Sequence, residues 1–174
     1  MPEPIIIYDY NPQWPDMYET ERRRICDVIG NKILAIEHIG STAVPRLGAK
    51  PIIDIMVAVN HMSDSLKCKE PLIKLGYVYH FWPAFPERCF FCESSIGASK
   101  YHIHMTEFMS DFWKEKLTFR DYLRTHRNTA QEYCRLKKIW AERYGVDREK
   151  YEAYTEAKTD FIQSVLDRAR TESE

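Results

Sequence analysis

The apolar run at residues 52–59 most constrains how this chain can fold, because one carboxylate, Asp54, stands inside it. A near-continuous apolar run of this length is typical of a strand covered on both faces of a sheet. An unpaired carboxylate in such a strand costs several kcal/mol, so Asp54 needs a compensating partner. The pattern therefore predicts either an ion pair with a neighbouring Lys or Arg, or a cation site.

The residues just before this strand suit a phosphate group. A strand-like run at 33–39 ends at Gly40-Ser41-Thr42, and Lys50 stands just before the second strand. A glycine-serine turn presents backbone N–H groups and a hydroxyl to an anion. Strand alternation puts Asp54 and Met56 on one face. The pattern indicates a phosphate cradle, a cation and a metal-ligating carboxylate on two adjacent strands, although each element alone also occurs as an ordinary turn or ion pair.

The order of elements predicts a mixed α/β (α+β) domain with a helical C-terminal part. After residue 110 no strand pattern appears, so we predict a core at 1–110 and a helical subdomain at 111–174 packed on it. Strands are expected at 33–39, 52–59, 77–81, 89–93 and 101–105, with a short extended segment at 5–8. Helices are expected at 15–29, at 64–75 with an early interruption at Pro71, at 112–123, at 133–144 ending at Gly145, and at 151–169.

Composition excludes several function classes. The 25 basic and 26 acidic residues leave a net charge of −1, which argues against bulk binding of nucleic acid or of an anionic membrane. No apolar run is long enough to span a membrane, and Met1–Pro4 lacks the features of a signal peptide, so we expect a cytoplasmic protein. The five cysteines indicate reduced thiols. Cys89 and Cys92 have zinc-like spacing, but residues three apart on a strand point to opposite faces, which favours a core role.

The run from Ile36 to Ile55 resembles the signature of the GrpB family, in which Glu-His-Ile-Gly-Ser-Thr-Ala-Val-Pro is followed by Lys-Pro-Ile-Ile-Asp-Ile. One departure is Arg46, where the family usually has glycine; it alters the turn or adds a cation. The resemblance implies a nucleotidyltransferase-like fold, a mixed sheet flanked by helices, and some members of the family are fused to dephospho-coenzyme A kinase. Further matching blocks are Tyr8–Trp14, Leu75–Tyr77, His102–His104, Phe119–Arg124, Tyr133 with Lys137, and Lys158 with Phe161 and Ile162.

The resemblance also implies a set of site residues. Asp54 and Glu37 are the candidate catalytic carboxylates, with Glu37 equally suited to an ion pair with Lys50 or Arg46. Asp54, His102 and His104 are the candidate metal ligands, although two histidines on an edge strand are often plain surface residues. The candidate phosphate-binding residues are Gly40, Ser41, Thr42, Lys50, Arg120, Lys137 and Lys158.

Met56 bears on the reaction. Nucleotidyl transfer commonly uses two divalent ions held by carboxylates, two of them at Asp-x-Asp spacing, and a thioether at the second position cannot hold Mg²⁺. One carboxylate with imidazoles suits Mn²⁺ or Zn²⁺ better. We therefore predict a protein that binds a nucleotide or a related phosphorylated small molecule. It is either a metal-dependent nucleotidyltransferase or a non-catalytic nucleotide- or coenzyme A-binding module, and the sequence leaves open which, as it does the oligomeric state.

Overall fold

The secondary structure mixes strands and helices as far as Glu107 and is helical thereafter. The computed structural model describes residues 5–83, 85–93, 99–144 and 148–172. The predicted helix end at Gly145 and most of the turn expected after Glu93 lie outside these ranges. The main elements are α1 (Trp14–Ile29), β1 (Ala35–Ile39), β2 (Ile53–Val59), α2 (Ser65–Lys74), β3 (Val78–His80), β4 (Arg88–Cys92), β5 (Tyr101–Glu107), α3 (Asp111–Thr125), α4 (Arg127–Tyr144) and α5 (Arg148–Thr171).

The five strands form one mixed sheet in the order β1-β2-β5-β4-β3. Strand β2 runs parallel to β5, and all other neighbours are antiparallel. The parallel register pairs Asp54 with His102 and Met56 with His104. The predicted α+β class is confirmed. Strand β2 is the inner strand expected at 52–59, since its residues from Ile55 to Val59 are fully buried.

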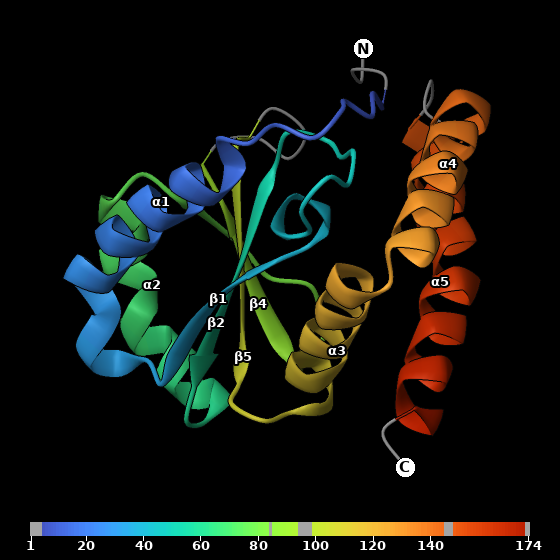
Figure 1. The fold of residues 1–174 in the computed structure, drawn as a ribbon. Helices are drawn as coiled ribbons and strands as arrows, with labels where there is room; N and C mark the ends of the chain where they lie inside the picture. Colours follow the sequence, from blue (N-terminus) through green and yellow to red (C-terminus); the bar gives the residue numbers. More distant parts are fainter. Residues whose placement is uncertain (1–4, 84, 94–98, 145–147, 173–174) are drawn as a thin grey trace.

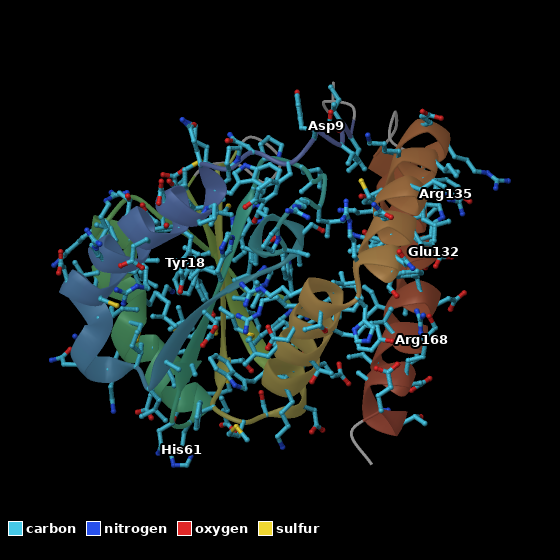
Figure 2. The ribbon with its side chains drawn as sticks, in the orientation of Figure 1. Asp9, Tyr18, His61, Glu132, Arg135 and Arg168 are labelled. Atoms are coloured by element: carbon cyan, nitrogen blue, oxygen red, sulfur yellow. The ribbon has the colours of Figure 1, made fainter. Side chains whose placement is uncertain are left out.

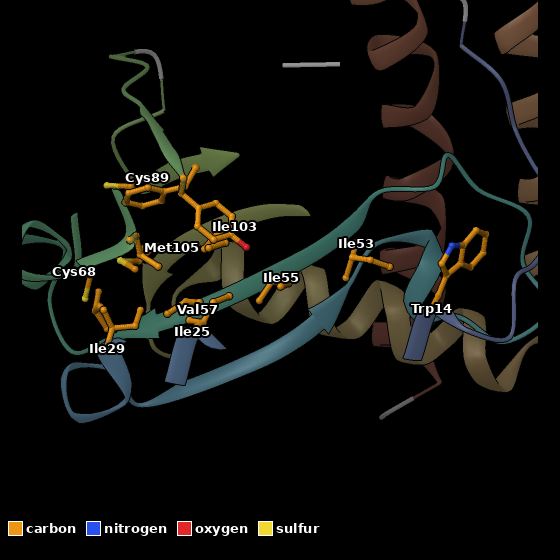
Figure 3. Close-up of a cluster of buried hydrophobic side chains, with 14 of the residues drawn as sticks. Trp14, Ile25, Ile29, Ile53, Ile55, Val57, Cys68, Cys89, Ile103 and Met105 are labelled. Carbon is orange, nitrogen blue, oxygen red and sulfur yellow. The ribbon is translucent and has the colours of Figure 1, made fainter. Parts of the chain in front are cut away.

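Helices cover both faces of the sheet, with α1 and α2 on one side and α3 on the other (Figure 1). The α4–α5 pair lies beyond α3, on the side away from α1 and α2. The larger core lies between the sheet and α1 with α2. There Ile53, Ile55 and Val57 of β2 share one buried cluster with Ile25 and Ile29 of α1 (Figure 3). This apolar layer fixes which face of β2 is left for polar groups.

The opposite face of β2 packs against α3. Met56 and Ala58 form a buried cluster with Trp113 of α3. The helix begins at a side-chain cap, because the Ser110 hydroxyl accepts a hydrogen bond of 3.2 Å from the Trp113 N–H. Asp54 belongs to this face because strand side chains alternate. The carboxylate therefore lies on the side of the sheet that the C-terminal helices cover.

One local prediction is corrected, and for the segment at 5–8, predicted as an edge strand or an extended segment, the second alternative fits. Pro71 does not interrupt its helix, because α2 continues from Ser65 to Lys74 with the proline inside it. Cys68 and Leu72 on either side of Pro71 are fully buried, and this packing outweighs the loss of one backbone hydrogen bond. The apolar segment at 5–8 forms no strand of its own and makes a single antiparallel bridge, between Tyr8 and Ala49.

Helix α3 contacts the sheet through β1 and β5 and also contacts α4 and α5. The division of the chain near residue 110 stays a prediction. The cysteines are free thiols, and Cys89 and Cys92 lie in different layers, with Cys89 in the core under α1 and α2. Within the described ranges, no helix combines the length and apolarity needed to cross a membrane.

Candidate functional site

Asp54 stands at the centre of a polar group on the α3 face of the sheet. Its Oδ1 lies 3.3 Å from Nε2 of His104 and 3.5 Å from Nδ1 of His102, so its partners are imidazoles rather than an arginine. Burial raises the pKa of Asp54, but the hydrogen bonds to both histidines outweigh it and hold this pKa well below its usual range. The side chain is still 29% exposed. Asp54 is therefore a charged carboxylate that a ligand can reach.

Gly40 lies directly against this carboxylate. Its φ is +72°, in the left-handed region that favours glycine. A Cβ at this position would be 2.5 Å from Oδ2 of Asp54, which is too close for any side chain. The following residues Ser41–Ala43 form the short helical turn that the sequence predicts. The absence of a side chain at Gly40 thus allows the Gly40-Ser41 turn to lie directly against the Asp54 carboxylate.

Each histidine keeps one ring nitrogen without a partner. Nε2 of His102 and Nδ1 of His104 are buried and make no hydrogen bond. Burial lowers the pKa of His104 more than Asp54 raises it, so this imidazole is neutral at pH 7. Its proton is then assigned to Nε2, which faces Asp54, and Nδ1 is a bare acceptor. A buried acceptor without a donor is unfavourable, so a ligand that supplies a hydroxyl, an N–H or a cation would stabilise this arrangement.

The donor set does not form a site for two magnesium ions. Met56, fully buried, stands where the Asp-x-Asp pattern needs a second carboxylate. Among the residues that the structure describes, no group of three or more His, Cys, Asp or Glu side chains is arranged to hold a metal ion. Both imidazoles instead turn toward the same oxygen of Asp54. A single divalent ion on Asp54, His102 and His104 stays a prediction.

Four lysines have charges that interact with one another, and those of Lys116 and Lys158 also interact with Asp54; we call them the lysine cluster: Lys50, Lys116, Lys137 and Lys158. Burial lowers the pKa of Lys158 to about 8; the charges of Lys50 and Lys116 act in the same direction and Asp54 acts against them. Burial also lowers the pKa of Lys116, with Arg88 adding to the effect. Lys116, Lys137 and Lys158 therefore each lie near at least one other positive group. A concentration of this kind suits a polyanion.

The members of the cluster come from separate segments. Lys50 and Lys158 both lie over the ring of the buried Tyr154, at 5.7 and 4.6 Å from its centroid. Lys137 is only 3% exposed. Its Nζ donates to the Ser41 hydroxyl at 2.9 Å and to the Gly48 carbonyl at 2.5 Å. Burial lowers the pKa of Lys137 to about 7. Lys137 therefore holds the two ends of the Ser41–Gly48 loop together.

Other predicted site residues are engaged inside the fold. Arg120 Nη1 donates to Glu37 Oε2 at 2.6 Å and to the His38 carbonyl, and its Nε donates to Asp121. This ion pair, rather than one with Lys50 or Arg46, is the one that Glu37 makes. The Thr42 hydroxyl donates to the Ile52 carbonyl at 3.2 Å and lies 3.0 Å from Nε2 of His38. The catalytic role of Glu37 and the phosphate-binding roles of Arg120 and Thr42 stay predictions.

Sequence reasoning missed Lys116 and the aromatic side chains beside the histidines. Phe90 of β4 lies 5.0 Å from the ring of His102 and 5.2 Å from that of His104, and Trp82 stacks on Phe90 at 4.9 Å. Lys116 precedes Arg120 by one helical turn, so helical spacing could have placed it on the same stripe of α3. No local signal marks Phe90, because its closeness to the site follows from the pairing of β4 with β5.

Comparison with known protein families gives one match over nearly the whole chain. A family model described as GrpB protein matches residues 4–168. A UPF0157 protein of Halalkalibacterium halodurans is 32% identical over 169 residues, which are 95% of this chain and 82% of that protein. A dephospho-CoA kinase of Mycobacterium bovis is 40% identical over 70 residues, which are 38% of this chain but only 17% of the kinase.

Solved structures show the same architecture. The crystal structure of the conserved protein GrpB from Enterococcus faecalis superposes with a TM-score of 0.81 at 29% identity, covering 94% of this chain and 98% of that one. Cid1 poly(U) polymerase with Mg 3′-dATP bound superposes with a TM-score of 0.54 at 17% identity, covering 79% of this chain and 44% of the polymerase. At that identity the second likeness is one of fold alone.

We expect Gly40→Ala to lower the free energy of unfolding by about 2 kcal/mol or more, because it combines a left-handed backbone with a clash against Asp54. Gly76→Ala is the matched control: Gly76 also has a positive φ, but nothing lies within 4 Å of its added Cβ. Urea denaturation measures both. Equal losses in the two variants would contradict the close approach of the turn to Asp54.

We expect Arg120→Ala to destabilise the fold by about 2 kcal/mol, because it leaves Glu37 and a backbone carbonyl without their donor. Arg135→Ala on α4 is the control and should change stability by less than about 0.5 kcal/mol, since Arg135 is exposed. Guanidinium denaturation checks both. A stable Arg120→Ala protein that no longer binds a phosphate ligand would instead support the predicted phosphate role.

The two lysines of lowered pKa make stability depend on pH. Their pKa values in the folded protein are about 7 for Lys137 and about 8 for Lys158, against 10.5 for an ordinary lysine. Between the folded-state pKa of each lysine and 10.5, the unfolded chain binds more protons than the folded protein. The free energy of unfolding therefore rises with pH in this range, by up to about 1.4 kcal/mol per pH unit for each lysine. Below about pH 7 this contribution is flat.

Denaturation curves between pH 6 and 9.5 test this. Lys137→Met and Lys158→Met should each show a smaller rise than the wild-type protein, whereas Lys138→Met, at an exposed lysine next to Lys137 on α4, should follow the wild-type curve. If all four proteins give parallel curves, the two amines are ordinary solvated lysines.

Proposed function

This chain belongs to the GrpB family, as its sequence predicts, and it has a nucleotidyltransferase-like fold. We propose that it binds a nucleoside triphosphate or a related phosphorylated small molecule at the lysine cluster. The observation that carries this proposal is the excess of positive charge around Asp54. Burial lowers the pKa of Lys116 and Lys158, and neighbouring cations add to it: Arg88 at Lys116, and Lys50 with Lys116 at Lys158. A chain of phosphates would relieve both effects at once, because it brings several negative charges to the same place.

The proposed roles follow from position. The Gly40-Ser41 turn and Lys50 receive the phosphates, with Lys116 and Lys158 added from the C-terminal helices. Lys137 acts on the same ligand indirectly, because its contacts with Ser41 and Gly48 set the shape of the loop. Lys137 could contact a phosphate directly only if its hydrogen bonds to Ser41 and Gly48 were broken.

Asp54 and its two histidines orient the ligand rather than neutralise it. The carboxylate stays charged, and the free nitrogens of His102 and His104 accept hydrogen bonds from ligand hydroxyls or amines. The aromatic pair of Phe90 and Trp82 lies next to these rings and offers a stacking surface for a planar group such as a nucleobase. Trp82 keeps 36% of its surface exposed, so one part of it is free for such contact.

Binding is supported better than nucleotidyl transfer through two magnesium ions. The buried Met56 removes the second carboxylate on which that reaction depends. A transferase that uses one ion on Asp54, with Mn²⁺ or Zn²⁺ favoured by the imidazoles, remains part of the proposal. The chain's own contribution to such a reaction is to position the phosphates and to offset their charge.

A second candidate is a non-catalytic module that binds coenzyme A or its precursors. Two observations favour it: Met56 in place of a carboxylate, and the match to 70 residues of a dephospho-CoA kinase. Coenzyme A also carries phosphates that the lysine cluster could hold. The two candidates differ in whether the preferred ligand is a nucleoside triphosphate or a coenzyme A precursor, and in whether product forms.

We expect the preferred ligand to raise the melting temperature of the wild-type protein by about 5 °C or more at one hundred times its Kd. The screen uses the four ribonucleoside triphosphates, dephospho-coenzyme A and coenzyme A, each with Mg²⁺, Mn²⁺, Zn²⁺ or a chelator. Lys158→Met should weaken binding about tenfold or more, since it removes one charged contact, and Lys138→Met should not. Binding should also weaken as pH rises from 7 to 9, because Lys137 and Lys158 lose their protons in that range.

Asp54→Asn separates the metal role from the phosphate role. A ligand effect that depends on a metal in the wild-type protein and is lost in Asp54→Asn supports the single-ion site, whereas equal effects in both proteins remove it. Movement of the label from an α-labelled triphosphate to an acceptor, with release of unlabelled pyrophosphate, then identifies a transferase. No stabilisation by any of these ligands, or equal stabilisation of Lys158→Met and wild type, would sink the proposal.

A further inference from the structure

Two surface pockets lie beside the loop that follows the Gly40-Ser41 turn, away from the lysine cluster. One, of about 300 Å³, is lined by Tyr18, Glu37 and His38 among others. The other, of about 440 Å³, is lined by Arg46, Arg124 and Arg127 over Pro45, Leu123 and Ala130, and we call it the arginine pocket. Neither is lined by Asp54 or by a member of the lysine cluster. We propose that the arginine pocket binds the phosphate group of a second, separate small molecule.

The charge in this pocket is not balanced from within. In the part of the chain that the structure describes, the side chains of Arg46 and Arg127 make no hydrogen bond or ion pair. Arg124 donates from Nε to the Ala43 carbonyl at 3.0 Å and lies 3.3 Å from Asp121. Asp121 also pairs with Arg120, so one carboxylate serves two guanidinium groups. Burial and the charge of Arg120 both lower the pKa of Arg124, as expected where cations are crowded.

The backbone at Arg46 supports a role for its side chain. Its φ is +66°, in the left-handed region where a Cβ is unfavourable and glycine is preferred. A glycine would satisfy this turn without strain. Arginine at this position therefore costs conformational free energy that the turn itself does not repay. A contact between its guanidinium and a ligand is the compensation that the pocket offers.

The shape and chemistry of the pocket define the class of ligand. Its volume falls in the range of small-molecule sites. Guanidinium groups bind phosphate oxygens in pairs and stack on planar groups, and Pro45, Leu123 and Ala130 provide an apolar floor beneath them. This combination suits a phosphorylated small molecule with an apolar or aromatic part. The net charge of −1 for the whole chain does not favour a nucleic acid.

The position of the pocket relates it to the proposed nucleotide site without depending on it. Val44 and Leu47 of the intervening loop pack with Leu123, Ala130 and Tyr133 in one buried cluster. The arginine pocket shares Pro45 with this loop, and Lys137 holds the loop's ends. A ligand in the arginine pocket therefore contacts the loop that carries the Gly40-Ser41 turn.

Calorimetric titration of the full chain with inorganic pyrophosphate tests the proposal. We expect two independent sites in the wild-type protein. Arg46→Gly and Arg127→Ala should each weaken one site by about tenfold or more and leave the other unchanged, while Lys158→Met should do the reverse. Arg135→Ala is the matched control, since Arg135 is exposed on the side of α4 that faces away from the sheet (Figure 2). Arg46→Gly should melt at the wild-type temperature or above it, because it relieves the positive φ.

The outcomes separate this proposal from the previous one. One site that is lost in Arg46→Gly but kept in Lys158→Met supports the arginine pocket and contradicts the lysine site. One site with the opposite response overturns the arginine pocket. So does an equal effect of Arg135→Ala, which indicates a non-specific charge effect, or an affinity for a single-stranded oligonucleotide that exceeds the affinity for pyrophosphate by more than about a hundredfold.

Discussion

The carboxylate of Asp54 is the group on which the rest of the site depends. It lies on an inner strand, where an isolated charge is costly, and the protein surrounds it with two imidazoles instead of an internal arginine. The parallel pairing of β2 and β5 supplies both histidines, and the left-handed Gly40 allows the turn to approach Oδ2. Partners of this kind hold the charge in place but leave it within reach of a ligand, because the Asp54 side chain keeps 29% of its surface exposed.

Arg120 and the lysine cluster differ in how completely their surroundings satisfy them. Arg120 has five donors, and acceptors from Glu37, Asp121 and a backbone carbonyl lie around it, so its environment is complete without a ligand. Lys116 and Lys158 are also partly buried, and this burial lowers their pKa values. Neighbouring cations add to the effect, Arg88 at Lys116 and Lys50 with Lys116 at Lys158, while Asp54 opposes it. A fold that gains nothing from such an arrangement would place these amines in water. Their burial is explained if an anion shares the space.

The sequence predicted the elements well and the contacts between them only in part. Periodicity located the strands and helices within a few residues, and the Asp54 pattern with the family resemblance named most residues that meet around the carboxylate. The ion pair of Glu37 with Arg120 joins residues 83 apart, and no local pattern could identify it. Lys116 and Phe90 reach the site through the packing of α3 and the order of β4 and β5. The helix break predicted at Pro71 is wrong, because the burial of residues on both sides of a proline can override its tendency to interrupt a helix.

Met56 is more than a missing ligand. It is fully buried in a cluster with Ile39, Ala58 and Trp113, so this position on β2 is committed to packing against α3. A carboxylate there would lie among apolar side chains of α3 and β1, at a cost of several kcal/mol unless a neighbouring group paired with it. The packing of α3 and the loss of a second metal ligand are therefore one feature of the fold. Any chemistry at this site has to be built from a single carboxylate, two imidazoles and the neighbouring lysines, which is a set suited to holding and orienting phosphates.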